Sequence, residues 1–142
     1  MRFYFNDGGR ESAGFKGQAR DCVTRAIAIA SERSYAEVYS AINLAAKHEG
    51  VMAATGRGSS ARNGVLKDTW KQFLRDAGWV WTPTMHIGSG CTVHLRGDEL
   101  PSGRLIVSCS RHLVAVIDGV VHDTFDSTRD GKRCVYGYWR KS

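Results

Sequence analysis

The spacing of hydrophobic and polar positions changes about halfway along the chain. In the first half, apolar residues recur every three or four positions, the period of a helix with one buried face. After Gly78, apolar residues come in short runs or alternate with polar ones, which is typical of strands. The sequence therefore predicts N-terminal helices packed on a C-terminal antiparallel sheet, an α+β domain.

Two helices are predicted before residue 51. Residues 6–19 are rich in glycine and polar groups and are predicted to form an extended arm or loop. Asp21 is a suitable N-cap for a helix that begins at Cys22. A capping-box pattern, Ser34 to Glu37, predicts the start of the second helix, and glycine at position 50 is its expected stop. The predicted apolar faces are Val23, Ala26, Ile27 and Ala30 in the first helix, and Val38, Ile42, Ala45 and Ala46 in the second.

A third helix is predicted between Asn63, as its cap, and Gly78, as its end. Residues 51–62, just before it, have no hydrophobic period and carry small polar side chains, so a mobile loop near a site is expected there. The predicted buried set of the third helix is Val65, Leu66, Thr69, Trp70, Phe73, Leu74 and Ala77.

The second half is predicted to hold the strands. An Asp118-Gly119 pair lies between two apolar runs, which is a strong signal for a hairpin with a two-residue turn. The predicted strands are 79–81, 91–95, 105–109, 112–117, 120–125 and 134–139.

Composition narrows the class of protein. The chain has 142 residues, of which 42% are hydrophobic and 24% charged, as expected for one folded domain over residues 1–142. No apolar run approaches the roughly 18–20 residues that span a bilayer, so no membrane partner is predicted. The first residues show no secretory signal, and a cytoplasmic protein is expected.

The net charge of +6 permits an anionic partner but does not demand one. The basic residues are spread along the chain, and no stretch of five is dominated by them. Nucleic acid is therefore a less favoured partner than a peptide or protein. The oligomeric state is not fixed by the sequence.

The four cysteines are predicted to be reduced thiols, because their spacing is irregular and a chain of this length does not need disulfides. Two Cys-x-x-His pairs exist, Cys91 with His94 and Cys109 with His112. Structural zinc usually takes four ligands at paired short spacings, and the two members of a pair on a strand point to opposite faces. No metal site and no cofactor is predicted.

Three residues together suggest covalent chemistry. Cys22 lies at a predicted helix N-terminus, where the helix dipole and unpaired N–H groups favour the thiolate. His112 starts a predicted core strand, and an acid, Asp123 or Asp126, follows on the paired strand. Taken alone, Cys22 is better interpreted as a small core residue, since cysteine is often buried. It is the joint pattern that indicates a site.

The hairpin register favours one of the two acids. A two-residue turn pairs Ile117 with Val120, which places His112 and Asp123 on one face as diagonal neighbours. A three-residue turn would shift the register by one and bring Asp126 opposite His112 instead.

These residue types have defined roles in thiol catalysis. An imidazole stabilises the thiolate and later delivers a proton to the leaving group, and a carboxylate orients the imidazole. The developing oxyanion needs donors, for which the backbone N–H of Cys22 and the side-chain amide of Gln18 are the candidates.

The order of Cys22, His112 and then a carboxylate on the next strand resembles the papain-like cysteine peptidases. The small bacterial members, including the double-glycine leader peptidases, are the nearest comparison. The Gln18-to-Cys22 segment resembles their entry to the nucleophile helix, and the apolar strand led by His112 resembles theirs. Asp123-Thr124-Phe125 resembles the element that carries their third residue. The whole chain is also similar to phage and prophage proteins with an Asp-Cys-Val-x-Arg-Ala helix.

The resemblance implies a compact papain-like fold and a peptidase or amidase, with the protein acting in a bacterial cell or a phage-infected host. It implies Cys22, His112 and Asp123 as the triad, with Gln18 or Cys22 N–H at the oxyanion and Asp126 as the alternative acid. Two other functions stay open. One is a non-catalytic protein that blocks a host protein or nucleic acid, and the other is an acyltransferase or deamidase of the same fold.

Overall fold

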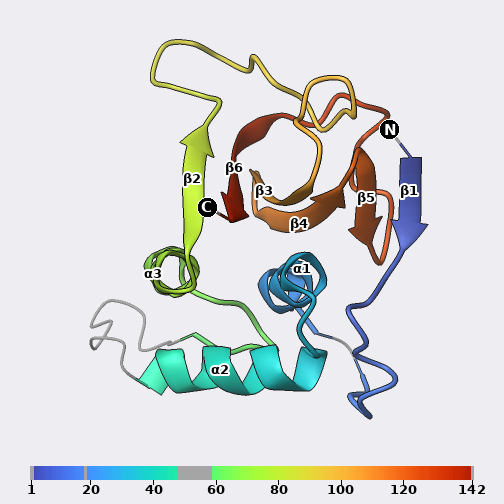
Figure 1. The fold of residues 1–142 in the computed structure, drawn as a ribbon, viewed down its shortest axis with the longest axis vertical. Helices are drawn as coiled ribbons and strands as arrows, with labels where there is room; N and C mark the ends of the chain where they lie inside the picture. Colours follow the sequence, from blue (N-terminus) through green and yellow to red (C-terminus); the bar gives the residue numbers. More distant parts are fainter. Residues whose placement is uncertain (1, 18, 48–58, 142) are drawn as a thin grey trace.

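The computed structural model describes residues 2–17, 19–47 and 59–141, in which three helices and six strands follow one another (Figure 1). Their order confirms the α+β class. They are β1 (Arg2–Phe5), α1 (Cys22–Ser31), α2 (Tyr35–Lys47), α3 (Lys67–Asp76), β2 (Trp79–Pro83), β3 (Arg104–Cys109), β4 (His112–Ile117), β5 (Val120–Asp123) and β6 (Val135–Lys141).

The six strands form one sheet in the order β1-β5-β4-β3-β6-β2. The predicted sheet was antiparallel throughout, but the observed one is mixed, because β1 joins its edge parallel to β5. Sequence patterning missed β1 for a physical reason. All four of its side chains are exposed, so it has no buried face to give a period of two.

Both faces of the sheet are covered. Helix α1 lies against β3, β4 and β5, α2 packs on the outside of α1, and α3 lies beside β2 (Figure 1). The core between helices and sheet is built from residues such as Ile27, Val38 and Trp139. On the other face, Leu95 and Leu100 from the segment before β3 pack with strand residues in a second core.

The helix ends differ from expectation in two places. Asp21 precedes α1 as predicted, but its carboxylate makes no capping hydrogen bond to the helix. Helix α3 begins at Lys67 rather than just after Asn63, because Gly64 takes a φ of 127° within a turn that pairs it with Ser60. For α2, the predicted cap is confirmed by a 3.2 Å hydrogen bond from Glu37 N–H to Ser34 Oγ. Its expected stop at position 50 and most of the predicted loop, residues 51–58, lie outside the described residues.

The β4–β5 hairpin is confirmed with the predicted register. Ile117 pairs with Val120, and the two turn residues, Asp118 and Gly119, have φ values of 47° and 79°. A type I′ turn requires positive φ at both central positions, which an Asp-Gly pair tolerates well. The alternative register, with Asp126 opposite His112, is therefore wrong.

The prediction that all four thiols are reduced is wrong for two of them. Cys91 and Cys134 form a disulfide with a Cα–Cα distance of 5.8 Å. The segment before β3 folds back onto the start of β6, where Val135 N–H donates to the Val93 carbonyl at 2.8 Å. Residues 91–95 are consequently not a strand and form only a bridge between His94 and Cys134. Irregular spacing could not reveal this contact, because it depends on the tertiary path of the chain.

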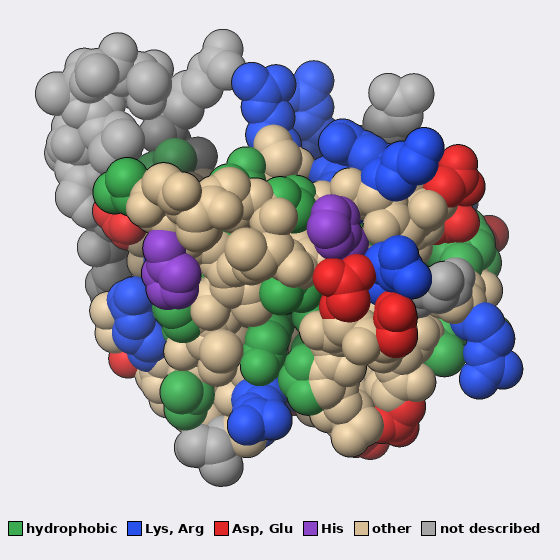
Figure 2. All heavy atoms as spheres, turned by 90° about the horizontal axis from the view of Figure 1, so that it is seen from above, with side chains coloured by type: hydrophobic (Ala, Val, Ile, Leu, Met, Phe, Trp, Pro, Cys, Tyr) green, Lys and Arg blue, Asp and Glu red, His purple; other side chains and the backbone are tan. Residues whose placement is uncertain are grey.

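Two further features are the lengths of the helices and the distribution of charge on the surface. Within the described residues, no helix combines the length and the apolar character needed to cross a membrane. On the face seen in Figure 2, Lys and Arg side chains are spread around the rim, with acidic side chains beside some of them. On this face the positive charge is not gathered into one continuous patch.

Candidate active site

Three chain elements bring the predicted site residues together. Cys22 is the first residue of α1, His112 is the first residue of β4, and Asp123 is the last residue of β5. Helix α1 packs across β4 and touches β5, so its N-terminus lies over the end of the hairpin where the other two residues stand. The fold thus joins residues that are distant in the sequence.

The three side chains form a hydrogen-bonded chain. His112 Nε2 lies 2.6 Å from Asp123 Oδ2. Cys22 hydrogen-bonds to the His112 side chain. Because Asp123 occupies Nε2, Nδ1 is the ring nitrogen left for the thiol. The Phe125 ring packs on the imidazole with centroids 5.4 Å apart, which further restricts how the ring can turn.

The thiol and the imidazole are poised to exchange a proton. Burial opposes ionisation of Cys22, but the hydrogen bond and positive charge of His112 and the Leu113 N–H lower the pKa of the thiol below its usual 9.0. Burial likewise disfavours the imidazolium, but Asp123 and Cys22 raise the pKa of His112 above 6.5. Both shifts favour a thiolate–imidazolium pair over the neutral pair.

Asp123 is held as an ionised carboxylate. Burial favours its protonated form, yet hydrogen bonds from His112, the Thr124 N–H and the Ser127 hydroxyl bring its pKa below 3.8. The Ser127 hydroxyl donates to Oδ2 at 2.9 Å, and the Thr124 N–H donates to Oδ1 at 2.8 Å. With two fixed donors besides the imidazole, the carboxylate cannot rotate away from His112.

Sequence reasoning missed the residue that ties the helix to the acid. Arg25, one turn after Cys22, pairs with Asp123 at 3.3 Å and also contacts the Asp21 carboxylate. Its side chain is 11% exposed, so this cation lies largely out of water. The Asp21–Arg25 spacing of four is a known helical ion-pair pattern and was the available signal. Arg25 also contributes to the lowered pKa of Cys22.

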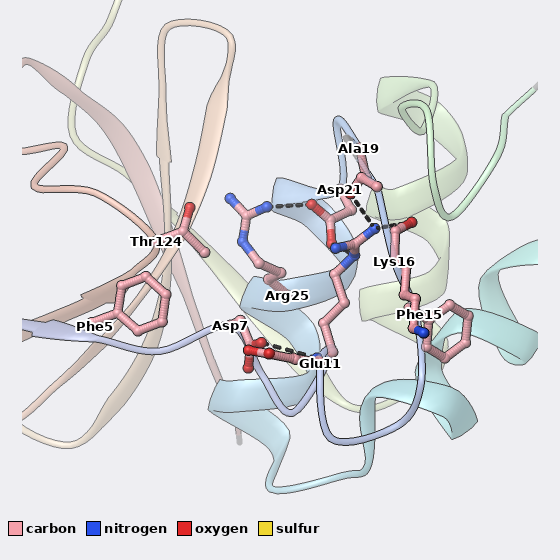
Figure 3. Close-up of a pocket in the computed structure, with 11 residues that line it drawn as sticks. Phe5, Asp7, Glu11, Phe15, Lys16, Ala19, Asp21, Arg25 and Thr124 are labelled. Carbon is pink, nitrogen blue, oxygen red and sulfur yellow. Dashed lines mark hydrogen bonds and ion pairs between the residues drawn. The ribbon is translucent and has the colours of Figure 1, made fainter.

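Asp21 belongs to the same network rather than acting as a helix cap. Tyr35 donates to its Oδ2 at 2.6 Å, and Arg10 lies 3.6 Å from the same oxygen. The Asp21 carboxylate raises the pKa of Tyr35, in addition to the effect of burial, so the phenol stays protonated and remains a donor. Figure 3 shows Arg25 turned toward Asp21, with Thr124 of the strand end on its other side.

The remaining predicted candidates are placed less centrally. Asp126 accepts from the Thr128 hydroxyl at 2.7 Å and from its N–H at 3.0 Å, and the imidazole is bonded to Asp123 instead. Gln18, the predicted oxyanion donor, lies outside the described residues. The Cys22 N–H is in the first turn of α1, where backbone donors have no partner within the helix.

A cavity of about 370 Å³ opens beside the thiol and the imidazole. Its walls come from the start of α1, the turn before α3 and the β3–β4 hairpin. The Thr24 hydroxyl, which donates to the Ala61 carbonyl at 2.7 Å, fixes this turn against α1. The lining residues are Arg20, Cys22, Val23, Asn63, Gly64, Val65, Lys67, Trp70, Ser108, Cys109, Arg111, His112 and Leu113.

A second free thiol borders the same cavity. Cys109 is 4% exposed, and burial raises its pKa to about 11 despite the nearby Arg133. This thiol is therefore protonated at neutral pH and is a poor nucleophile. Within the described residues, no three His, Cys, Asp or Glu side chains are grouped so as to hold a metal ion.

Comparisons with known proteins identify no family. No family model matches the chain, and neither a curated protein nor a solved structure matches it.

Proposed function

We propose that this protein is a papain-like, cysteine-dependent hydrolase that acts on a peptide or protein amide through Cys22, His112 and Asp123. The observation that carries the proposal is the hydrogen-bonded chain Cys22–His112–Asp123, in which the thiol pKa is lowered and the imidazole pKa is raised. A buried structural cysteine has no need of an ionised partner, and Cys109 in the same protein shows the opposite shift.

The reaction proceeds in two steps. The Cys22 thiolate attacks the carbonyl carbon, and the Cys22 N–H at the helix start donates a hydrogen bond to the oxyanion that forms. The His112 imidazolium then gives its proton to the leaving amine as the C–N bond breaks, which leaves an acyl-thioester on Cys22. In the second step, neutral His112 takes a proton from water as the oxygen attacks the thioester carbonyl, and the C–S bond then breaks to release the acid and restore the Cys22 thiolate beside the His112 imidazolium. Asp123 keeps Nε2 occupied throughout, so that Nδ1 faces the thiol and the substrate.

The test is the rate of Cys22 alkylation by iodoacetamide as a function of pH, read by peptide mass spectrometry. Wild-type Cys22 is expected to react readily at about pH 6, and His112→Ala is expected to slow it at least tenfold. Cys109 is the internal control and should stay unlabelled. A Cys22 that reacts only as fast as Cys109 would overturn the proposal.

A transferase or deamidase of the same fold would pass that labelling test, because it shares the thioester intermediate. The distinction is what attacks the thioester, and the product mass reports it. Water gives a cleaved peptide or, on a glutamine side chain, a mass gain of about one unit. An amine gives a transferred acyl group.

The resemblance also leads us to propose the cytoplasm of a bacterial cell or a phage-infected host as the place of action. Disulfides are rare in that compartment, which makes Cys91 and Cys134 a useful reporter. Labelling with a maleimide in intact cells reports whether this disulfide exists where the protein acts, and labelling of both thiols there would support the cytoplasmic location. A protein isolated with this pair fully oxidised, under conditions that trap thiols at lysis, would contradict a cytoplasmic location.

A further inference from the structure

The Lys, Arg, Asp and Glu side chains that line the cavity beside Cys22 are all basic. Arg20, Lys67 and Arg111 are among its lining residues, and the lining includes no Asp or Glu. Among the described residues, no carboxylate forms a salt bridge with any of these three cations (the ion pairs of the described part of the chain lie elsewhere). The positive charge is thus left to act on whatever enters the cavity.

A second hollow of about 560 Å³, also lined by His112, has more basic than acidic side chains. Its basic lining residues are Arg111, Arg129 and Arg133. Its one acidic lining residue is Asp126, whose carboxylate accepts a hydrogen bond from the Thr128 hydroxyl. Arg111 borders both hollows, because it occupies the two-residue turn that precedes His112. Basic side chains therefore line both hollows that border His112.

This excess of basic over acidic lining residues does not simply follow from the net positive charge of the protein. The cavity shown in Figure 3 is lined in part by Asp21 and Arg25 and has equal numbers of acidic and basic lining residues. Its acidic lining residues are Asp7, Glu11 and Asp21, and its basic ones are Arg10, Lys16 and Arg25.

Folding does not explain the three cations either. Lys67 is the first residue of α3 and Arg20 comes just before α1, where the positive end of a helix dipole disfavours a cation. Arg111 has a φ of 54°, a region that long side chains rarely adopt. Local stability would favour other residues at all three positions.

Part of the remaining lining is apolar. Val23, Val65, Trp70 and Leu113 line the cavity together with the polar residues Asn63 and Ser108. Trp70 is buried, so its ring forms a fixed wall. A lining that combines apolar and cationic side chains suits a ligand side chain with a short aliphatic stem and a terminal carboxylate.

We propose that the site selects acidic peptides, binding a Glu or Asp side chain of the substrate in the cavity beside Cys22. Lys67 and Arg111 are the residues that bind its carboxylate, and Arg129 and Arg133 attract further acidic residues beyond His112. This inference rests on the proposed function, since it names the substrate class of the same site.

Two alkylating agents of nearly equal size separate the charge effect from thiol reactivity. Iodoacetate is an anion and iodoacetamide is neutral. The ratio of their rates at Cys22 should exceed that of a free cysteine peptide, and Lys67→Gln/Arg111→Gln should lower it about fivefold. The matched control is Arg140→Gln, which removes one exposed charge from β6 outside both hollows and should leave the ratio unchanged.

The outcomes are distinct for the two proposals. Slow iodoacetamide labelling of wild-type Cys22 would overturn the proposed hydrolase function, whatever the ratio of the iodoacetate rate to the iodoacetamide rate. Fast iodoacetamide labelling with a ratio that the double variant does not change leaves the hydrolase standing and overturns the acidic preference.

Protection of Cys22 identifies the class of macromolecule. A hexaglutamate peptide should slow iodoacetamide labelling of the wild type, and a hexaglutamine peptide of equal length should not. The Lys67→Gln/Arg111→Gln variant should lose the protection. Protection by a single-stranded DNA oligonucleotide but not by hexaglutamate would overturn the proposal in favour of nucleic-acid binding.

Discussion

Cys22 and Cys109 border the same cavity, but the pKa values of their thiols are shifted in opposite directions. At the helix end, an imidazole and nearby donors lower the pKa of Cys22. At the strand end, burial raises the pKa of Cys109 to about 11. Both thiols are largely removed from water, so burial alone does not decide their chemistry. The difference lies in the partners, because His112 and nearby donors outweigh burial at Cys22, whereas Arg133 does not outweigh it at Cys109.

The largest effect is expected from removing one thiol or the other. Cys22→Ala should abolish all labelling by iodoacetamide at about pH 6, since the other free thiol is protonated there. Cys109→Ala should leave the labelling rate unchanged. From thiolate fractions alone, Cys22 should outpace Cys109 at least about tenfold. Similar labelling rates for both thiols, measured by mass spectrometry, would contradict the proposed difference between Cys22 and Cys109.

Arg25 tests whether the helix end depends on its buried cation. Arg25→Met keeps the length but leaves the Asp21 and Asp123 carboxylates without it, and should cost about 3–5 kcal/mol in the free energy of unfolding. Urea denaturation measures this loss. Arg25→Lys, which keeps the charge, should retain more stability and a lower Cys22 pKa than Arg25→Met. Equal effects of both variants would show that the charge is irrelevant.

Asp123 tests how the imidazole is held. Asp123→Ala removes the acceptor for Nε2 and should slow Cys22 labelling about tenfold at pH values near 6, because the imidazolium loses its stabilising partner. Asp123→Asn keeps an acceptor oxygen and should recover part of the rate. A Ser127→Ala control removes a donor to Asp123 without touching the imidazole. If Asp123→Ala labels like the wild type, Asp123 does not orient His112.

The smallest effect concerns stability against pH, and it is cleanest in a Cys22→Ala background. The folded pKa of His112 is raised, so its contribution is complete below the unfolded value of 6.5 and is lost as pH rises through the folded pKa. The folded pKa of Asp123 is lowered, so its contribution is present above 3.8 and is lost as pH falls through the folded pKa. The melting temperature should therefore fall by a few degrees above about pH 6.5. His112→Ala should flatten that fall, and an unchanged profile would contradict the His112–Asp123 pairing.

Local signals in the sequence were enough to predict the geometry of the hairpin. Asp118-Gly119 specified the turn, the turn set the register, and the register brought His112 to Asp123. The same reasoning could not find β1, because an exposed four-residue edge strand has no burial pattern. It could not find the Cys91–Cys134 contact, which depends on the path of an irregular segment.

The role of Arg25 was only partly predictable from the sequence. Its spacing from Asp21 was visible, but its contact with Asp123 joins positions 98 residues apart. Helical spacing predicts neighbours on one helix and says nothing about which strand end will meet them. The residues of the site were therefore predictable as a set, whereas the ion pairs that hold them required the folded chain.

The parallel pairing of β1 with β5 gives the site a high contact order. Asn6 N–H donates to the Asp123 carbonyl at 2.8 Å, so the first strand of the chain anchors the strand that carries the acid. During synthesis, the 98 positions from Arg25 to Asp123 take about 5–20 s to translate. For that time a nascent chain carries Cys22 without its acid. The thiol acquires its partners only when the two ends of the chain have met, so its reactivity is tied to the completion of folding.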